Sequence, residues 1–159
     1  MASTKRAFMK LTEAPEIVTW PETRYIFIEK IGPFQQTAPQ AWQELHQLVP
    51  RISEDNKITG YMSLYKVAAK IYRAGVSLAA APIRLPESVR YEHFKGGKYC
   101  RFVLTGPYSN LPAASGRVFE IVAERQITLR DDYCIEHYVN DPRTTPEEQL
   151  TTEILIPTI

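Results

Sequence analysis

The chain has 159 residues, of which 44% are hydrophobic and 23% charged, and this size and composition fit one globular domain with a substantial core. Its 19 Lys and Arg residues nearly balance 18 Asp and Glu residues, so the net charge is only +1 and a basic surface for direct nucleic-acid binding is not expected. No apolar run approaches the roughly 20 residues of a membrane span, and two cysteines are too few for a disulfide-stapled secreted domain, so we expect a cytoplasmic protein.

Two segments of the chain resemble each other, and both predict a strand that ends at a turn. Residues 24–34 read RYIFIEKIGPF, and residues 98–108 read KYCRFVLTGPY. Each run is rich in β-branched and aromatic residues, which favour strands, and each ends in Gly-Pro-aromatic. Glycine frees the backbone at that point and proline cannot continue a ladder of strand hydrogen bonds, so each strand should stop there.

A helix is expected after each turn, because the spacing of the apolar residues changes from that of a strand to that of a helix. In the first helix, which should begin near residue 37 with Pro39 in its first turn, the apolar positions are Trp42, Leu45, Leu48 and Val49. In the second helix, which should begin near Pro112, the apolar positions are Val118, Phe119, Val122 and Ala123. Trp42 aligns with Gly116 between the two segments, so the helices are related but differ in bulk.

Two more strands are expected after each helix, at residues 57–67, 69–80, 133–139 and 150–157. The pattern predicts an α+β fold of two pseudo-symmetric β-α-β-β modules, which form antiparallel sheets around a central ligand cleft. We expect a single domain over residues 1–159, with internal repeats at about 16–80 and 90–159. A linker at 82–91, an added strand at 90–94, and an N-terminal arm at 1–11 that is frayed or paired with a sheet edge complete the expected organisation.

The strongest candidate for function is the carboxylate of Glu136, which lies in the middle of an expected strand. Side chains alternate along a strand, so Cys134, Glu136 and Tyr138 share one face, while the other face holds Ile135, His137 and Val139. If the face of Ile135 packs under a helix, Glu136 points into the cleft beside the phenol of Tyr138.

The internal repeat places further candidates on the opposite wall of the cleft. Alignment of the two modules puts three residues of the first across from Glu136, namely Tyr61, Ser63 and Tyr65. Aromatic rings attract cations by roughly 0.5–2 kcal/mol each, and a desolvated carboxylate adds a stronger Coulomb attraction. The pattern favours a flat or bulky organic cation over an anion. The expected ligand-binding residues are Glu136, Tyr138, Tyr65, Tyr61, Cys134 and Ser63, and no cofactor is expected.

Each of these residues also has a purely structural interpretation. Glu136 could pair with a cross-strand cation such as Lys66, or point to solvent at a sheet edge. Tyrosine is common in strands, so Tyr61, Tyr65 and Tyr138 could be ordinary residues of a sheet. The residues themselves leave these alternatives open.

Other kinds of site find less support. Cys134 and His137 form a Cys-x-x-His pattern, but residues three apart in a strand lie on opposite faces and cannot share an ion, so no metal site is expected. The carboxylate of Glu136 would raise the pKa of the Cys134 thiol and would not activate it as a nucleophile. The sequence Gly-Gly-Lys at residues 96–98 lacks the other residues of a phosphate loop and is expected to form a β-hairpin turn.

The chain also contains three longer motifs: GPY at residues 106–108, IEHYVNDP at 135–142 and PEEQLTTEILIP at 146–157. Together they resemble the GyrI-like small-molecule-binding family, which includes effector domains of AraC-type and multidrug-responsive MerR-type regulators and gyrase-inhibitory proteins. The likeness extends from about residue 16 to residue 159. It implies two related modules around a cleft for hydrophobic cations, with a central acid at the position of Glu136. Several relatives have a tryptophan on the second helix where this chain has Gly116, so the pocket should differ on that side.

Three functions are compatible with these features. The first is a stand-alone binding protein that senses or sequesters lipophilic or aromatic cations, and the resemblance implies multidrug binding or transcription regulation as its role. The alternative, also implied by the resemblance, is a hydrolase of strained electrophilic compounds such as cyclopropanes, in which Glu136 would activate water and Tyr138 or Tyr65 would protonate the leaving atom. The third, implied by the resemblance, is inhibition of a macromolecule such as DNA gyrase.

The expected partners follow from these hypotheses. They are hydrophobic cationic small molecules, together with a separate regulatory or target protein. Residues 1–15 are too few for a DNA-binding module, so direct nucleic-acid binding is not expected, and neither is membrane binding.

Overall fold

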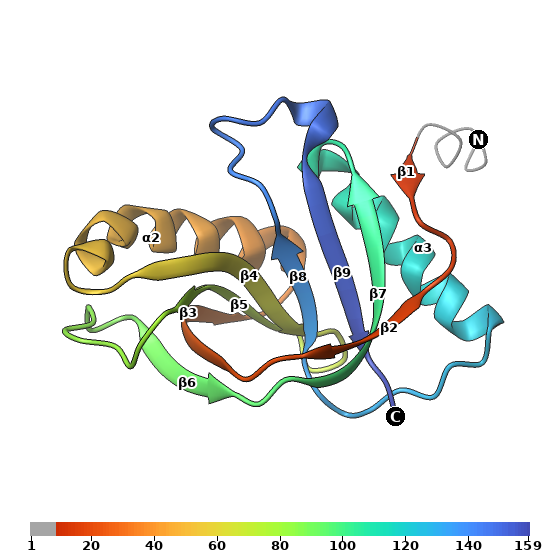
Figure 1. Ribbon diagram of the computed structural model, residues 1–159, viewed down its shortest axis with the longest axis horizontal. Helices are drawn as coiled ribbons and strands as arrows, with labels where there is room; N and C mark the ends of the chain where they lie inside the picture. The colour runs from red at the N-terminus through yellow and green to blue at the C-terminus, as the bar shows by residue number, and fades with distance from the viewer. Residues whose placement is uncertain (1–8) are drawn as a thin grey trace.

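The computed structural model describes residues 9–159, which form one nine-stranded antiparallel sheet with two α-helices (Figure 1). The strands are β1 (Lys10–Leu11), β2 (Glu16–Trp20), β3 (Thr23–Ile31), β4 (Ile58–Lys66), β5 (Ile71–Leu78), β6 (Arg90–Phe94), β7 (Gly97–Thr105), β8 (Cys134–Tyr138) and β9 (Thr151–Pro157). The α-helices are α2 (Phe34–Asp55) and α3 (Leu111–Glu124), and the short 3₁₀ helices are η1 (Tyr108–Asn110) and η2 (Glu147–Gln149). The predicted α+β fold class is confirmed.

The strand order contains two modules of the same design. Along the sheet the strands run β1-β7-β9-β8-β4-β5-β3-β6, and β2 also pairs with β7. In the first module, β3-α2-β4-β5, strand β5 lies between β3 and β4. In the second, β7-α3-β8-β9, strand β9 lies between β7 and β8. The modules meet where β4 pairs with β8, so the predicted pair of pseudo-symmetric β-α-β-β modules is confirmed.

The first strand of each module ends at a glycine with a positive φ. Gly32 follows β3 with φ 139° and Gly106 follows β7 with φ 133°, a conformation that residues with a side chain rarely adopt. The Gly32 N–H donates to the carbonyl of Lys70 at 3.0 Å, and the Gly106 N–H donates to the carbonyl of Leu150 at 2.8 Å. The Gly-Pro turns therefore end the strands as predicted, and each also ties its turn to the start of the third strand in the same module.

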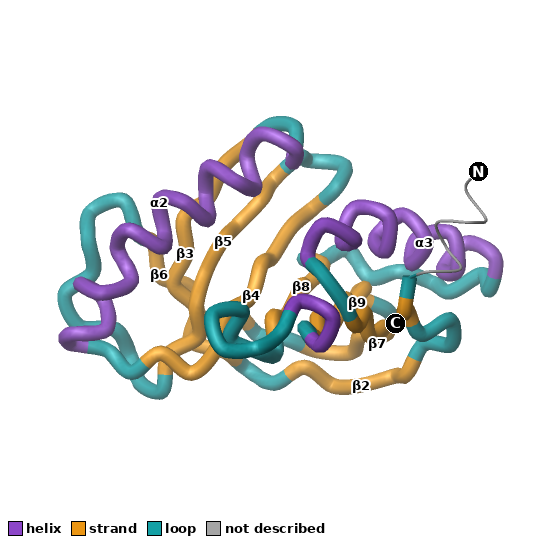
Figure 2. Tube along the Cα trace, turned by 90° about the horizontal axis from the view of Figure 1, so that it is seen from above, coloured by secondary structure: helices purple, strands orange, loops and turns teal. Residues whose placement is uncertain are grey.

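Both helices cover the same face of the sheet (Figure 2). The buried positions are Thr37, Ala41, Leu45 and Ile52 in α2, and Ala114, Val118, Ile121 and Val122 in α3. Their helical spacing forms an apolar stripe on each helix, which packs with strand residues such as Ile26 and Tyr72 in one large core. Helix α2 begins at Phe34, earlier than predicted, because the carbonyl of Pro33 already accepts hydrogen bonds from the next turn.

Two bent segments connect the outer edges of the two modules and run over the sheet face opposite the helices. Strand β2 continues into β3 and β6 continues into β7, and β2 pairs with β7 while β3 pairs with β6 (Figure 1). At the crossing, a Cβ on Gly96 would lie 2.2 Å from the carbonyl oxygen of Trp20, so only glycine fits. The prediction of a β-hairpin turn at residues 96–98 is wrong, because the strands that they connect pair with different neighbours at distant positions in the sheet.

A second core lies on the sheet face opposite the helices, beside these bent segments. Its buried side chains are Tyr25, Phe27, Met62, Leu64, Phe94, Tyr99, Ile135 and Leu155. Ile135 therefore does not pack under a helix, and Val139 is 49% exposed, so the condition under which Glu136 was expected to point into the cleft is not met. The sheet is buried on both faces at this point, and alternation in such a strand cannot tell which face the helices cover.

The remaining segments are short. The predicted added strand at 90–94 is confirmed as β6, and β1 pairs with the edge of β7. The rest of the predicted arm, residues 1–8, lies outside the described residues. Neither α2 nor α3 has the combination of length and hydrophobicity that would let a described helix cross a membrane.

Candidate functional site

The six residues predicted to form the site lie together where the two modules meet. In the register of β4 and β8, the opposed pairs are Ser63 with Glu136, Tyr61 with Tyr138, and Tyr65 with Cys134. Opposed residues of antiparallel strands project to the same face, so all six side chains share one face. Tyr65 and Cys134 belong to the core that contains the helix residues, which identifies this face as the one that the helices cover.

We call the pairing of β4 with β8 the seam between the two modules. Ser63 and Glu136 occupy corresponding positions at its centre. Each stands in the middle of the paired stretch of its strand, so the pseudo-two-fold relation between the modules exchanges one for the other. The Ser63 side chain is fully buried, whereas Glu136 is half-buried. The duplicated fold therefore places a single carboxylate beside a hydroxyl group at its centre.

A chain of hydrogen bonds connects α2 to this carboxylate. The indole Nε1 of Trp42 donates to the hydroxyl of Tyr72 at 2.8 Å. The Tyr72 hydroxyl lies 2.7 Å from Ser63 Oγ, which lies 2.8 Å from the Tyr138 hydroxyl. Finally, the Tyr138 hydroxyl donates to Glu136 Oε1 at 2.9 Å. Four side chains from α2, β5, β4 and β8 thus lead to one oxygen of Glu136.

The direction of this chain is fixed at both ends. An indole nitrogen can only donate, and at the other end the hydroxyl of Tyr138 donates to Glu136. Because Tyr138 gives its proton to Glu136, Ser63 must donate to Tyr138 and Tyr72 must donate to Ser63. All four donors therefore point toward Glu136, an arrangement that matches the ionised form of the carboxylate.

The pKa values around Glu136 reflect burial opposed by these donors. Burial raises the pKa of Glu136, and the hydroxyls of Tyr138 and Ser115 oppose that rise. Burial is also the main cause that raises the pKa values of Tyr72 and Tyr138, and the nearby carboxylate raises them further. The two phenols therefore keep their protons and remain hydrogen-bond donors.

Glu136 has no cationic partner among residues 9–159. The cross-strand cation considered as its partner is Lys66. Its Nζ lies 3.9 Å from Asp131 Oδ1 and 4.8 Å from the centroid of the Tyr133 ring. None of the ion pairs of the described residues includes Glu136. The structure therefore differs from the alternative in which Lys66 neutralises this acid.

Aromatic rings surround the phenol that binds Glu136. The ring centroids of Trp42 and Tyr138 lie 5.4 Å apart, and those of Tyr108 and Tyr138 lie 5.5 Å apart, both in edge-to-face contacts. The ring centroid of Trp42 also lies 6.4 Å from that of Tyr61. The sequence had identified Trp42 only as part of an apolar helix stripe. The other neighbours that it did not identify are Phe34, Tyr72, Tyr108 and Ser115.

The missed residues come from elements that are distant in the sequence. Tyr72 lies in β5 opposite Tyr65, so its face could have been assigned from strand alternation once the order of the sheet was known. Trp42 and Tyr108 reach the site from α2 and η1, and no local pattern indicates that they meet Tyr138. These contacts depend on how the elements pack.

Cys134 and Tyr65 are poorly suited to reactive roles. Burial, followed by the charges of Glu136 and Asp132, raises the pKa of the Cys134 thiol to about 12, so this cysteine remains a thiol at neutral pH. The Tyr65 hydroxyl is buried without a hydrogen-bond partner, although Ser115 lies near enough to oppose part of the rise that burial causes in its pKa. Within the described part of the chain, no three His, Cys, Asp or Glu residues are arranged to hold a metal ion.

The chain matches a family model described as GyrI-like small molecule binding domain over residues 13–158. A search of curated protein sequences gives no significant match. Among solved structures, the EcmrR C-terminal domain has a TM-score of 0.73 and 15% identity, and the match covers 96% of this chain and 98% of that one.

Two further structures have a similar fold. SAV2435, solved with bound tetraphenylphosphonium, has a TM-score of 0.66 and 16% identity, with 91% of this chain and 93% of that one covered. A structure described as a hydrolase from Listeria innocua has a TM-score of 0.61 and 12% identity, with 99% and 98% covered. At these identities, each likeness shows the fold alone.

Proposed function

Because the chain belongs to the family of GyrI-like small molecule binding domains, we propose that it binds a hydrophobic organic cation against the carboxylate of Glu136. The observation that carries this proposal is a half-buried acid that receives a directed chain of hydrogen bonds and lacks a cationic partner in the described residues. A ligand with a positive charge supplies the missing partner.

The surroundings of Glu136 favour a cation with an aromatic or otherwise apolar body. Tyr138 binds the carboxylate, and the rings of Trp42 and Tyr108 pack against Tyr138. Each ring that contacts a cation contributes roughly 0.5–2 kcal/mol. Burial would favour the neutral acid, but the oriented donors stabilise the negative charge that the ligand requires. Tetraphenylphosphonium, which is bound in the structure of SAV2435, has this combination of charge and rings and is therefore a suitable probe.

The decisive variant is Glu136→Gln, which keeps the size of the side chain and an oxygen that accepts from Tyr138. We expect it to weaken the binding of tetraphenylphosphonium by about 1.5–3 kcal/mol, which is roughly 10- to 150-fold in the dissociation constant. Isothermal titration calorimetry measures this change. Triphenylphosphine oxide, which is neutral and has similar rings, is the matched control and should bind both proteins equally. An equal loss for both compounds would reject the ion-pair mechanism.

The same site predicts a pH dependence. The pKa of Glu136 is raised above the usual 4.5 of a glutamate, so affinity for the cation should fall as the pH drops through that raised value. Below it, affinity should decrease by up to about tenfold per pH unit, because the proton competes with the cation for the carboxylate, and should level off near the affinity of the Glu136→Gln variant. Triphenylphosphine oxide should show no such slope, and neither should the Glu136→Gln variant with either compound. A slope that persists in the variant would assign the titration to another group.

A further inference from the structure

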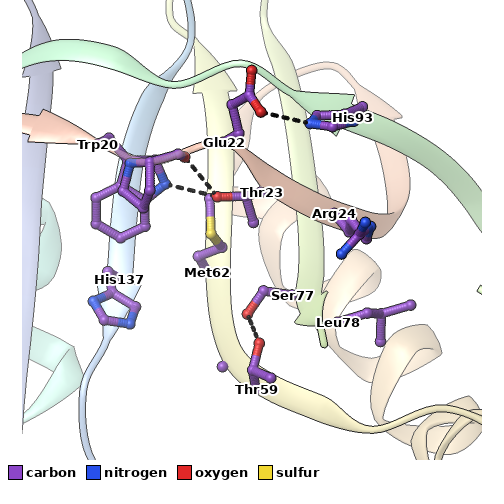
Figure 3. A pocket seen from close by; sticks show the side chains of 12 residues that line it. Trp20, Glu22, Thr23, Arg24, Thr59, Met62, Ser77, Leu78, His93 and His137 are labelled. Atoms are coloured by element: carbon purple, nitrogen blue, oxygen red, sulfur yellow. Dashed lines mark hydrogen bonds and ion pairs between the residues drawn. The ribbon is translucent and has the colours of Figure 1, made fainter. Parts of the chain in front are cut away.

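A cavity of about 360 Å³ lies on the other side of the seam (Figure 3). Met62 and His137 line it, and they alternate with Ser63 and Glu136 along β4 and β8, so they point to the opposite face of the sheet. The other walls come from the bend between β2 and β3, from β5 and from β6. This cavity is therefore separate from the site around Glu136.

Gly60 makes room for an atom at the wall of this cavity. A Cβ at this position would lie 3.1 Å from Ser77 Oγ and 3.9 Å from His137 Nε2. The two polar atoms thus flank the same small space, which the side chain of any other residue would fill. Gly60 is not among the glycines with a positive φ, so the backbone conformation does not demand glycine. Glycine inside a strand often marks a bulge or a place where a ligand comes close to the backbone. The pairing of β4 with β5 is irregular between Ile58 and Gly60, and the space beside Gly60 opens into the cavity.

The imidazole of His137 is held in one orientation with Nε2 next to this space. Its Nδ1 lies 2.7 Å from Oε1 of Glu153, and the bond to His137 is the main cause that lowers the pKa of Glu153. Because a carboxylate accepts, Nδ1 carries the proton of this bond, and in the neutral form of the ring Nε2 is then the hydrogen-bond acceptor. Trp20 packs edge-to-face on the ring with centroids 5.3 Å apart, which fixes its position further.

The other side of the space offers a donor. Ser77 Oγ lies 2.8 Å from Thr59 Oγ1. In such a pair one hydroxyl donates to the other, and the accepting hydroxyl keeps its own proton for a third group. The wall around Gly60 therefore presents an acceptor and a donor beside each other.

The rest of the cavity favours an uncharged ring. The indole N–H of Trp20 is occupied by Thr23 Oγ1 at 3.2 Å, so this side chain offers apolar surface, and buried Met62 adds to it. The lining carries charges of both signs, since it contains Arg24 as well as Glu22, which lies 3.5 Å from Nε2 of His93. With charges of both signs and an apolar wall facing two hydrogen-bonding groups, a neutral ligand fits better than an ion.

We propose that this cavity is a second binding site, which takes a small neutral ring compound carrying a hydrogen-bond donor next to an acceptor. Its donor binds His137 Nε2, its acceptor receives the hydroxyl proton of the Ser77 and Thr59 pair, and its ring lies against Trp20. A lactam ring, as in uracil, and a sugar ring with neighbouring hydroxyls both have this chemistry.

The two tryptophans of the chain allow the two sites to be observed separately. Trp20 lines the cavity, while Trp42 contacts the site of Glu136, so their indole resonances in a ¹H–¹⁵N spectrum report on different ligands. Uracil or methyl glucoside should move the Trp20 resonance in a saturable way, with a dissociation constant in the millimolar range expected for so small a ligand. Neither compound should move the Trp42 resonance, and tetraphenylphosphonium should move Trp42 more than Trp20. The stronger of the two neutral probes identifies the ring type.

Two variants and a control test the assignment. Gly60→Ala fills the space and Ser77→Ala removes a hydroxyl without adding bulk, and each should weaken the neutral probe by about tenfold or more. Gly116→Ala is the matched control, because a Cβ there meets nothing within 4 Å, and it should leave binding unchanged. The proposal is rejected if neither neutral probe moves the Trp20 resonance, if benzoate moves it more than both, or if the two variants bind as tightly as the control.

Discussion

The two modules share a backbone plan but contribute different groups to their common seam. The first module supplies the neutral donors Trp42, Tyr72 and Ser63, whereas the second supplies the acid Glu136 and the phenol that binds it. Where α2 has Trp42, the aligned position of α3 has Gly116, whose surroundings are open. The difference shows how a duplicated fold can hold one unpaired charge at its centre: one copy keeps the charge and the other provides the dipoles that stabilise it.

Of the substitutions that test this difference between the modules, the loss of Trp42 should reduce the stability of the protein most. Trp42→Ala removes a partly buried indole that contacts Tyr138 and donates to Tyr72. We expect the free energy of unfolding, measured by urea denaturation, to fall by about 2–4 kcal/mol. This is less than the roughly 3–5 kcal/mol of a fully buried tryptophan, because the indole is only partly buried. Trp42→Phe, which keeps a ring and loses only the N–H, should cost less than half as much. A loss below about 1 kcal/mol for Trp42→Ala would show that the indole contributes little to the packing of this module.

A smaller effect is expected when one hydroxyl is removed from the hydrogen-bond chain. Tyr72→Phe leaves the indole N–H of Trp42 and the hydroxyl of Ser63 without their partner, so stability should fall by about 1–2 kcal/mol. Tyr65 is the matched control, because its ring stacks on that of Tyr72 and its own hydroxyl is buried without a hydrogen bond. Tyr65→Phe should be neutral or stabilising in the same urea experiment. Equal losses for the two variants would mean that the connected hydroxyl has no special role.

The smallest change in stability is expected in the second module, at Gly116 of α3. Gly116 lies inside α3, where alanine is favoured over glycine by about 0.5–1 kcal/mol, and an added methyl group meets no neighbour within 4 Å. Gly116→Ala should therefore raise the free energy of unfolding by about that amount, which thermal or urea denaturation can measure. A destabilised variant would reveal that this face of α3 is more crowded than its counterpart around Trp42.

Much of the architecture could be predicted from local patterns. The Gly-Pro turns after β3 and β7, the helices that follow them and the later strands appear close to the expected residues, since period, turn chemistry and the repeat all gave the same answer. Alternation also placed Cys134, Glu136 and Tyr138 on one face. The same kind of reasoning failed at residues 96–98, where a Gly-Gly pair joins strands that do not pair with each other.

The sequence by itself determined which residues form strands and helices and which side chains of β8 point the same way, because these properties depend on neighbours within a few positions of the chain. Only the tertiary structure decided that the helices cover the face of Glu136, that Trp42 and Tyr72 complete its hydrogen-bond chain, and that Lys66 pairs elsewhere. It also decided that Gly60 and His137 meet in a cavity on the reverse face. Those contacts join elements far apart in sequence, and their geometry depends on strand order and sheet curvature, for which no local spacing provides a signal.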